Sequence, residues 1–331
     1  MINLHSNIKI TNEFKIKNRI VVPPMASATA DQNGFVTKQT LEHYKRLTNS
    51  KAGLIMVEYT YINPAGKSEP NQLGILSDLH IEGLKNLANV IHHQGSASGI
   101  QLTHAGGKSN RSLTDGSLIS PSGIAVPVKD RQMQEPDTAS SEDISELKNS
   151  FLNAAIRAYT AGFNIIELHC AHGYGLNQWL SPLTNKRHDK YGGNNDNRSR
   201  LLYEVVKLIK ENLPKSILSV RIPGMDHIPG GLAYQDTIKI IQNLESLDVN
   251  IINVSSGIGG WRRPKNRMGE GYLVADAAII QKNTSLPVIG VGGIKSAEFI
   301  NDCLQQKKIS LAAVGRSILE NPQWGPNIGL N

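Results

Sequence analysis

The stretch Asn164-Ile-Ile-Glu-Leu-His-Cys-Ala-His-Gly-Tyr174 begins with an apolar run and ends with two histidines and a tyrosine. The run 164–168 is short and apolar, as expected of a strand buried on both faces. The residues after it would therefore project from the end of a buried strand. Two imidazoles and a phenol provide two hydrogen-bond donors and one proton donor. Such groups suit polarising a carbonyl and protonating a neighbouring carbon.

Similar runs recur along the chain, with helical segments between them. Seven further β-rich runs occupy residues 19–22, 53–57, 99–102, 217–221, 250–254, 286–290 and 310–314. Apolar residues spaced three or four apart predict a helix over about 144–158, capped by Ser140 and Asp143, and two more over about 197–213 and 233–247. Eight strands alternating with helices predict an α/β fold, a (β/α)8 TIM barrel. An open doubly wound sheet is the alternative.

Composition narrows the class of protein. The chain has 331 residues, 39% of them apolar, and lacks a linker or a low-complexity segment, so we expect a single domain over 1–331. The net charge of +7 is modest, and no block of five basic residues occurs. These features favour anionic small molecules over nucleic acid.

Cysteine usage and hydropathy indicate the compartment. Cys170 and Cys303 are too few for a disulfide framework or an iron–sulfur cluster, and fit a reducing environment. The N-terminus lacks a signal-peptide pattern, and no apolar run reaches membrane-spanning length. We therefore expect a cytoplasmic protein without membrane contact.

A barrel should carry its chemistry where strands end. Polar or glycine residues follow almost every predicted strand: Pro23 to Ala28 after the first, Gln101 and His104 at the third, Arg221 at the fifth, Ser255-Ser-Gly257 at the sixth, Gly292-Gly293 at the seventh and Gly315-Arg316 at the eighth. The strand bodies stay apolar. Packing alone hardly explains this coincidence.

Two of these strand ends suggest an anion site. Glycine lets backbone N–H groups approach a phosphate closely, and Arg316 can form two hydrogen bonds to its oxygens. Gly293 and Gly315 stand where barrels usually bind phosphate. The alternative is that tight turns between strand and helix require these glycines.

Arg221 should lie partly inside the barrel mouth, because it follows an apolar run. A buried cation needs an anionic partner. One interpretation is an ion pair with an acidic side chain such as Glu167. The other is a ligand group that gains negative charge during catalysis.

The remaining candidate residues could also have purely structural or metal-binding roles. His169 and His172 could bind zinc, but no fixed third and fourth ligands are evident, so we expect no metal. Tyr174 could be a packing residue. His104 could be a structural loop histidine, and Cys170 a small buried residue.

A set of motifs occurs in one order along the chain: the Pro24-Met25 loop, Gln101-x-x-His104-Ala-Gly, His169-x-x-His172-Gly-Tyr174, Ser181-Pro-Leu, Arg187…Tyr191-Gly-Gly-x-x-x-Asn197-Arg198, Ser255-Ser-Gly257 and Gly315-Arg316…Asn321-Pro322. Together they closely resemble the old yellow enzyme family over residues 17–324. The segment 169–198 is the most specific part. The paired histidines resemble the bacterial enoate reductase branch.

The resemblance implies an FMN-bearing barrel, an NAD(P)H-dependent flavin oxidoreductase that reduces activated alkenes such as enones, maleimides and nitroalkenes with NADPH or NADH. It implies that His169 and His172 bind the substrate oxygen, that flavin N5 delivers hydride to the β-carbon and that Tyr174 protonates the α-carbon. The implied FMN-binding residues are Pro24, Met25 and Ala26 at the ring, Gln101 at the pyrimidine edge, Arg221 near N1 and O2, and Gly293, Gly315 and Arg316 at the phosphate.

The sequence also departs from the family pattern. Ala26 stands where relatives often have cysteine or threonine, Ala28 where a substrate-contacting tyrosine is usual, and Gly107 where arginine is common. Ala28 therefore suggests a roomier pocket. Several relatives place an arginine of their C-terminal tail in a neighbouring subunit's site, but residues 317–331 contain no Lys or Arg, which argues against a dimer with shared sites. Trp324 is the only suggested substitute, and a homo-oligomer is possible.

Four cations, Arg262, Arg263, Lys265 and Arg267, crowd the loop after the sixth strand. They could be a solvated face or attract the 2′-phosphate of NADPH. Three functions remain: an ene-reductase, another FMN barrel such as a dihydrouridine synthase, and a flavin-binding or diaphorase-like barrel with little alkene reduction.

Overall fold

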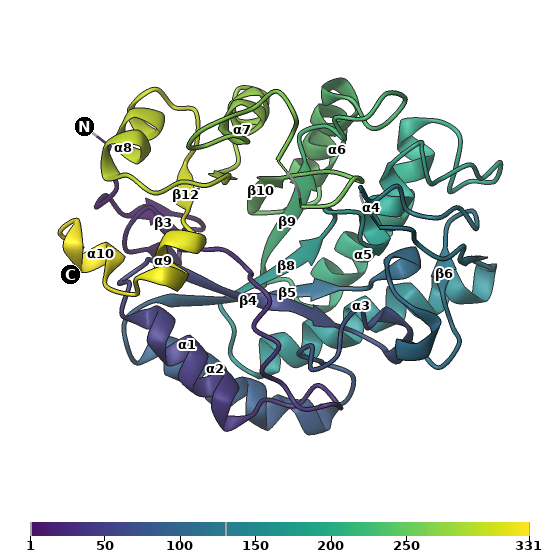
Figure 1. Cartoon of the computed structure of the whole chain (residues 1–331), viewed down its shortest axis with the longest axis horizontal. Helices are drawn as coiled ribbons and strands as arrows, with labels where there is room; N and C mark the ends of the chain where they lie inside the picture. The colour runs from purple at the N-terminus through teal and green to yellow at the C-terminus, as the bar shows by residue number, and fades with distance from the viewer. Residues whose placement is uncertain (1, 130, 262, 331) are drawn as a thin grey trace.

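Eight parallel strands close into a barrel in the computed structural model, which describes residues 2–129, 131–261 and 263–330 (Figure 1). Around the barrel they run β3 (Ile20–Val22), β4 (Leu54–Tyr61), β5 (Ala97–Thr103), β8 (Ile165–His169), β9 (Ile217–Pro223), β10 (Ile251–Ser255), β11 (Val288–Gly290) and β12 (Leu311–Ala313). The pairing of β12 with β3 closes the ring. The predicted TIM barrel is confirmed, and the alternative open sheet is wrong.

Helices form the outer layer and follow the strands in turn (Figure 1). The long ones are α1 (Lys38–Thr48), α2 (Ile81–His92), α3 (Ser141–Thr160), α5 (Asn195–Asn212), α6 (Tyr234–Ser246), α7 (Val274–Gln281) and α8 (Ala297–Gln305). Short helices are α4 (Gly175–Leu180), α9 (Arg316–Glu320) and α10 (Trp324–Asn327), and 3-10 turns span Pro64–Gly66, Asp78–His80, Gly106–Lys108 and Arg111–Leu113. The three helices predicted from spacing are confirmed within a few residues, except that α3 begins at Ser141.

The predicted cap of α3 forms a reciprocal pair. Ser140 Oγ accepts from the Asp143 N–H at 3.1 Å, and the Asp143 carboxylate accepts from the Ser140 N–H at 2.8 Å. Both bonds satisfy N–H groups that the first helical turn leaves free. The sequence pattern therefore located this helix end correctly.

The core has two layers because strand side chains alternate between the barrel interior and the helices. One apolar cluster fills the interior, with Val21, Leu54, Ile165 and Ile251 among its members. A larger cluster lies between strands and helices. The hairpin of β1 (Ile8–Lys9) and β2 (Lys15–Ile16) adds Ile8 and Ile16 to the interior cluster.

A long excursion leaves the barrel between β5 and α3. It contains the parallel pair β6 (Ile119–Ser120) and β7 (Asp137–Thr138). The sequence analysis predicted neither this pair nor the β1–β2 hairpin. Strands of two residues are too short to show any periodicity, and their pairing is decided by the tertiary fold.

Candidate functional site

Two adjoining cavities lie at the carboxyl ends of the barrel strands. The first has a volume of about 470 Å³ and the second about 550 Å³. Both are lined by Pro23, Met25, His172, Arg221 and Trp261, so these residues form a shared wall. The location agrees with the rule that barrel enzymes bind ligands at this face.

The predicted site residues divide between the two cavities. The first is lined by Pro24, Met25, Ala26, Gln101, His169, His172, Tyr174 and Arg221. The second is lined by Gly293, Gly315 and Arg316, again with Met25, His172 and Arg221. Residues from six strand ends or the loops after them therefore meet in one continuous region.

A tight turn brings His169, His172 and Tyr174 together. The ring centroids of the two histidines are 5.0 Å apart with nearly perpendicular planes, and those of His169 and Tyr174 are 4.7 Å apart. The backbone between them is left-handed, with φ of 60° at His172 and 76° at Gly173. A Cβ at Gly173 would lie 2.7 Å from the carbonyl oxygen of Ile258. Only glycine fits this point, so the left-handed turn is fixed by the sequence at Gly173.

Both histidines are neutral at physiological pH. Burial lowers the pKa of each well below its usual value, and the nearby Arg221 charge lowers both further. Ser255 Oγ accepts a hydrogen bond from Arg221 Nη2 at 3.2 Å and lies 2.6 Å from His172 Nε2. If the serine hydroxyl donates to Nε2, His172 keeps its hydrogen on Nδ1. His169 Nδ1 is buried and has no partner within the described part of the chain.

Tyr174 keeps its proton at all ordinary pH values. Burial and the nearby Glu69 charge raise its pKa to about 12. Its ring contacts that of Tyr59 at 5.4 Å, and Lys108 Nζ lies 4.1 Å from the centre of the Tyr174 ring. Lys108 also donates to the His172 carbonyl oxygen at 2.6 Å. Burial lowers the pKa of Lys108 to about 8, with Glu69 opposing the shift and Arg131 adding to it.

Arg221 is buried without the ion pair that the sequence left open. Glu167 instead accepts from Gln101 Nε2 at 2.8 Å, Ser219 Oγ at 2.8 Å and Asn253 Nδ2 at 2.9 Å. No carboxylate of the described residues forms an ion pair with Arg221, and its Nε lacks a hydrogen-bond partner. A buried, unpaired guanidinium requires an anionic or electron-rich ligand.

The residues at the first cavity fit an isoalloxazine ring. Gln101 uses its amide nitrogen on Glu167, which leaves its buried Oε1 without a partner and available to accept from a ligand N–H. Arg221 Nε is likewise free to donate. One unsatisfied acceptor and one unsatisfied donor match the polar edge of a flavin, which offers both N–H and carbonyl groups.

The second cavity fits a phosphate. Gly292 and Gly293 have φ of 126° and 68°, and a Cβ at Gly293 would lie 3.0 Å from Arg316 Nη2. A Cβ at Gly315 would lie 3.1 Å from Met25 Sδ. Side chains at these points would therefore fill the space between the strand ends and Arg316. The two cavities together suit FMN.

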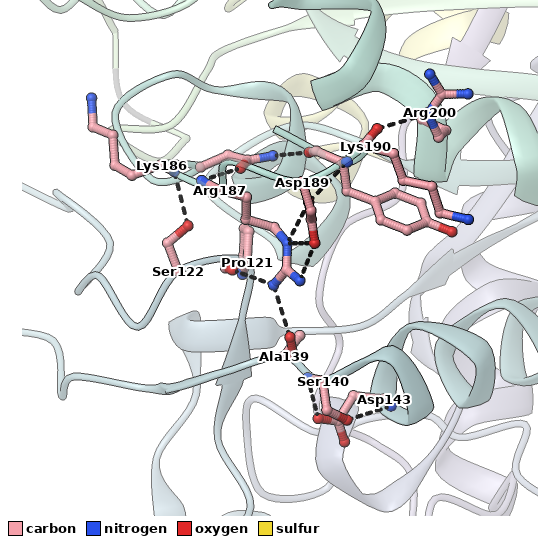
Figure 2. A network of polar contacts seen from close by, with 12 residues as sticks. Pro121, Ser122, Ala139, Ser140, Asp143, Lys186, Arg187, Asp189, Lys190 and Arg200 are labelled. Atoms are coloured by element: carbon pink, nitrogen blue, oxygen red, sulfur yellow. Dashed lines mark hydrogen bonds and ion pairs between the residues drawn. The ribbon is translucent and has the colours of Figure 1, made fainter. Parts of the chain in front are cut away.

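Contacts of Arg187 hold the loop after α4 against the excursion (Figure 2). Its Nη1 donates to the carbonyl oxygens of Pro121 at 2.9 Å and Ala139 at 2.8 Å, and its Nη2 pairs with Asp189 at 2.6 Å. In the same loop, Lys186 N donates to Ser122 Oγ at 2.8 Å. The motif that follows Tyr174 thus supports the site without lining either cavity.

Several residues have structural positions. His104 is buried outside both cavities, its Nδ1 accepts from the Gly106 N–H at 3.0 Å, and burial lowers its pKa to about 4. Burial raises the pKa of the Cys170 thiol well above its usual value, which makes it unreactive. Trp324 is buried and donates to the Lys295 carbonyl oxygen at 2.9 Å. It therefore packs against its own chain.

Two residues with expected roles near the site lie as follows. Ala28 is exposed and is not among the residues that line either cavity. Arg267 pairs with the buried Asp276 at 2.7 Å, whereas Arg263 lines the second cavity. Arg262 lies outside the described residues.

Several residues that line the first cavity were not predicted from the sequence, among them Tyr59, Glu69, Lys108, Arg131 and Trp261. Tyr59 belongs to β4, which extends four residues beyond the apolar run that predicted it. The others lie in loops or 3-10 turns, where only the tertiary fold decides which side chains face the cavity. No local signal could have identified them, although Lys108 stands next to the His104-Ala-Gly motif.

The described residues contain neither a membrane-spanning helix nor a cluster of metal ligands. In residues 2–129, 131–261 and 263–330, no helix combines the length and apolar character needed to cross a bilayer. Over the same ranges, no three His, Cys, Asp or Glu side chains gather as a metal site.

Comparisons with known proteins identify the family of this chain. A sequence model of the NADH:flavin oxidoreductase / NADH oxidase family matches residues 3–329. NADPH dehydrogenase from Geobacillus sp. (strain WCH70) is 38% identical over 93% of this chain and 88% of its own length. NADPH dehydrogenase from Bacillus subtilis (strain 168) is 35% identical over 94% and 89%.

Solved structures share the fold. The old yellow enzyme homologue from Zymomonas mobilis superposes with a TM-score of 0.85 at 24% identity, covering 98% of this chain and 92% of that one. Morphinone reductase in complex with tetrahydroNAD gives a TM-score of 0.84 at 22% identity, covering 99% and 91%.

Proposed function

Because this chain belongs to the NADH:flavin oxidoreductase / NADH oxidase family, with the old yellow enzymes, we propose that it reduces activated C=C bonds. It is an FMN-dependent oxidoreductase that uses NADPH or NADH. The proposed substrates are enones, maleimides and nitroalkenes. We also propose that one domain, residues 1–331, carries the whole site.

Each part of the site has a proposed role. His169 and His172 donate hydrogen bonds to the substrate's carbonyl or nitro oxygen, and Tyr174 protonates the α-carbon. Bound FMN would supply the two-electron redox chemistry that couples oxidation of NAD(P)H to hydride addition at the β-carbon. The C=C π bond is thereby replaced by two C–H bonds, and one NAD(P)H is oxidised. Neutral imidazoles can still stabilise developing negative charge on oxygen.

The proposed cofactor contacts follow from the unsatisfied groups. Gln101 Oε1 and Arg221 Nε would face the polar edge of the ring, and the backbone of Pro24, Met25 and Ala26 would face its plane. Arg221 would stabilise the charge that the ring gains on reduction. Gly293, Gly315 and Arg316 would hold the phosphate.

One observation carries the proposal. His169, His172 and Tyr174 contact one another on a cavity wall that also holds the unsatisfied Gln101 and Arg221. Oxygen-binding groups, a protonated phenol and flavin-edge groups therefore share one space. A flavin-binding or diaphorase-like barrel would not need the phenol and paired imidazoles together.

The test follows flavin absorbance anaerobically. Purified protein carrying FMN should lose the visible absorbance of oxidised flavin when NADPH is added, and should regain it when 2-cyclohexenone is added. Bleaching without recovery by any alkene would favour the diaphorase-like alternative. Protein that purifies without flavin and cannot take up FMN would contradict the whole proposal.

The nicotinamide preference is a separate proposal. Arg263 lines the second cavity near Arg316, and Arg is suited to binding phosphate. We propose that Arg262 and Arg263 favour NADPH over NADH. Trp324 donates to the Lys295 carbonyl oxygen of its own chain; we propose that each subunit of a homo-oligomer completes its own site.

A further inference from the structure

Three cations line the first cavity without a role in the chemistry proposed above: Lys108, Lys129 and Arg131. Lys108 ends the 3-10 turn Gly106–Lys108 just after β5, and the other two lie further along the excursion between β6 and β7. Glu69 is the only carboxylate among the described lining residues of this cavity. Among the described lining residues, these three cations therefore outnumber the one carboxylate even before Arg221 is counted.

Lys108 is the cation nearest the reacting atoms. Its Nζ lies 4.1 Å from the centre of the Tyr174 ring and 2.6 Å from the His172 carbonyl oxygen. The side chain is partly buried, and no carboxylate in the described ranges forms an ion pair with it. An ammonium group retains two further hydrogens for donation after the bond to His172. A partly buried ammonium group with free donors favours an anionic partner.

Arg131 adds a second positive charge nearby. It is exposed at the rim of the same cavity, and after burial and Glu69 its charge is the next influence on the pKa of Lys108. Two cations that face one space repel each other unless an anion lies between them. Lys108 and Arg131 therefore form a pair suited to one carboxylate that extends from the reaction centre toward the rim.

The anions of the cofactors do not account for this pair. The proposed phosphate residues Gly293, Gly315 and Arg316 line the second cavity and not the first. The nicotinamide ring must approach the reaction centre, and its carboxamide is uncharged. Lys108 therefore meets an uncharged part of NADPH, while its charge remains available to an anionic substrate.

We propose that the preferred alkene carries a carboxylate attached on the side of its α-carbon, bound by Lys108 and Arg131. This inference rests on the proposed ene-reductase function. The position follows from the geometry, because Tyr174 is the proton donor to the α-carbon and Lys108 lies over the Tyr174 ring. A carboxylate on that side is nearest Lys108 while the substrate oxygen faces His169 and His172.

The test compares 2-(carboxymethyl)cyclohex-2-enone with its primary amide, which has the same shape without the charge. For the wild-type holoenzyme at pH 7, kcat/KM for the carboxylate should exceed that for the amide by on the order of tenfold or more, as expected of one well-placed charged contact. Lys108→Met and Arg131→Gln should each reduce this ratio by several-fold or more (an order-of-magnitude expectation). Lys85→Met, on the exposed face of α2, should leave it unchanged.

Binding gives a second readout that does not depend on turnover. Isothermal titration of the oxidised holoenzyme with the saturated acid, 2-(carboxymethyl)cyclohexanone, should give a lower Kd than its amide, and Lys108→Met should remove the difference. Raising the salt concentration should increase the Kd of the acid more than the Kd of the amide.

The outcomes separate this inference from the proposed function. If 2-cyclohexenone is not reduced, the proposed function fails. If it is reduced but acid and amide react equally well, only the anionic-substrate inference fails. A higher KM for NADPH in Lys108→Met and Arg131→Gln, with an unchanged acid-to-amide ratio, would also overturn the inference by assigning both cations to the coenzyme.

Discussion

Replacing Tyr174 by Phe should separate the two half-reactions. The change removes the phenol hydroxyl but keeps the ring, which contacts those of His169 at 4.7 Å and Tyr59 at 5.4 Å and lies under Lys108 Nζ at 4.1 Å. The shape of the site should therefore persist. Flavin reduction by NADPH needs no proton from Tyr174, and its rate should stay within about twofold of wild type.

The alkene half-reaction should slow much more. General acids typically contribute about 10²–10⁴-fold to rate. Tyr174 is only 8% exposed, so water can hardly replace its hydroxyl, and we expect a loss of about 10³-fold within that range. Anaerobic stopped-flow, in which reduced holoenzyme is mixed with 2-cyclohexenone, measures the rate directly.

Tyr59→Phe is the matched control, because it makes the same change in a neighbouring phenol that is also 8% exposed. Its alkene half-reaction should stay within a few-fold of wild type. Reoxidation of the Tyr174→Phe variant at the wild-type rate would refute the proton-donor role. An equally large loss of rate in Tyr59→Phe would show that the effect is not specific to the Tyr174 hydroxyl, and would also contradict the assignment of the proton donor.

Three further predictions concern the phosphate site and two of the cations. Gly293→Ala should raise the Kd for FMN, measured by flavin fluorescence, roughly tenfold, because φ of 68° costs a side chain about 1–2 kcal/mol and the new Cβ would meet Arg316. An unchanged Kd would contradict the assignment of Gly293 to the phosphate site. Arg263→Ala should lower the NADPH-to-NADH ratio of kcat/KM several-fold, whereas Lys265→Ala, in the same loop, should not; equal ratios exclude Arg263. The ratio of kcat/KM for the acid to that for the amide should fall as pH rises through about 8, because Lys108 is charged below that pKa and neutral above it. A ratio that does not change between about pH 6 and about pH 10 would contradict the role of Lys108.

The last prediction assigns the pH effect to Lys108 among the groups that surround it. Tyr174, with its pKa near 12, stays protonated across this range, and the pKa of the His172 imidazole lies well below it. Glu69 and Arg131 line the same cavity. Lys129 lies on the same wall, so Lys129→Met should retain the pH dependence.

The barrel could be predicted from the sequence because its determinants are local. Strands buried on both faces appear as apolar runs, and all eight runs became barrel strands. Polar residues directly after those runs were assigned to the site because all parallel strands end at one face. This reasoning needs only the position of a residue relative to a strand, which explains why Gln101, Arg221 and Gly293 could be selected.

Other features depend on tertiary structure. Lys108 and Arg131 reach the cavity because the excursion after β5 folds back over the barrel, and no periodicity encodes that path. Ala28 has a left-handed backbone, with φ of 52°, and an exposed side chain, and neither property could be derived from the sequence alone. The absence of an ion pair between Glu167 and Arg221 was also undecidable, since three neutral donors satisfy Glu167 instead.

The path of the transferred hydrogen tests the central claim most directly. With NADPH deuterated at C4 of the nicotinamide and ordinary water, the holoenzyme should convert 2-cyclohexenone to cyclohexanone labelled at the former β-carbon. NMR of the product should find no label at the former α-carbon, which takes its hydrogen from Tyr174. Label at the α-carbon, or flavin reduction by NADPH with no labelled ketone formed, would contradict the account.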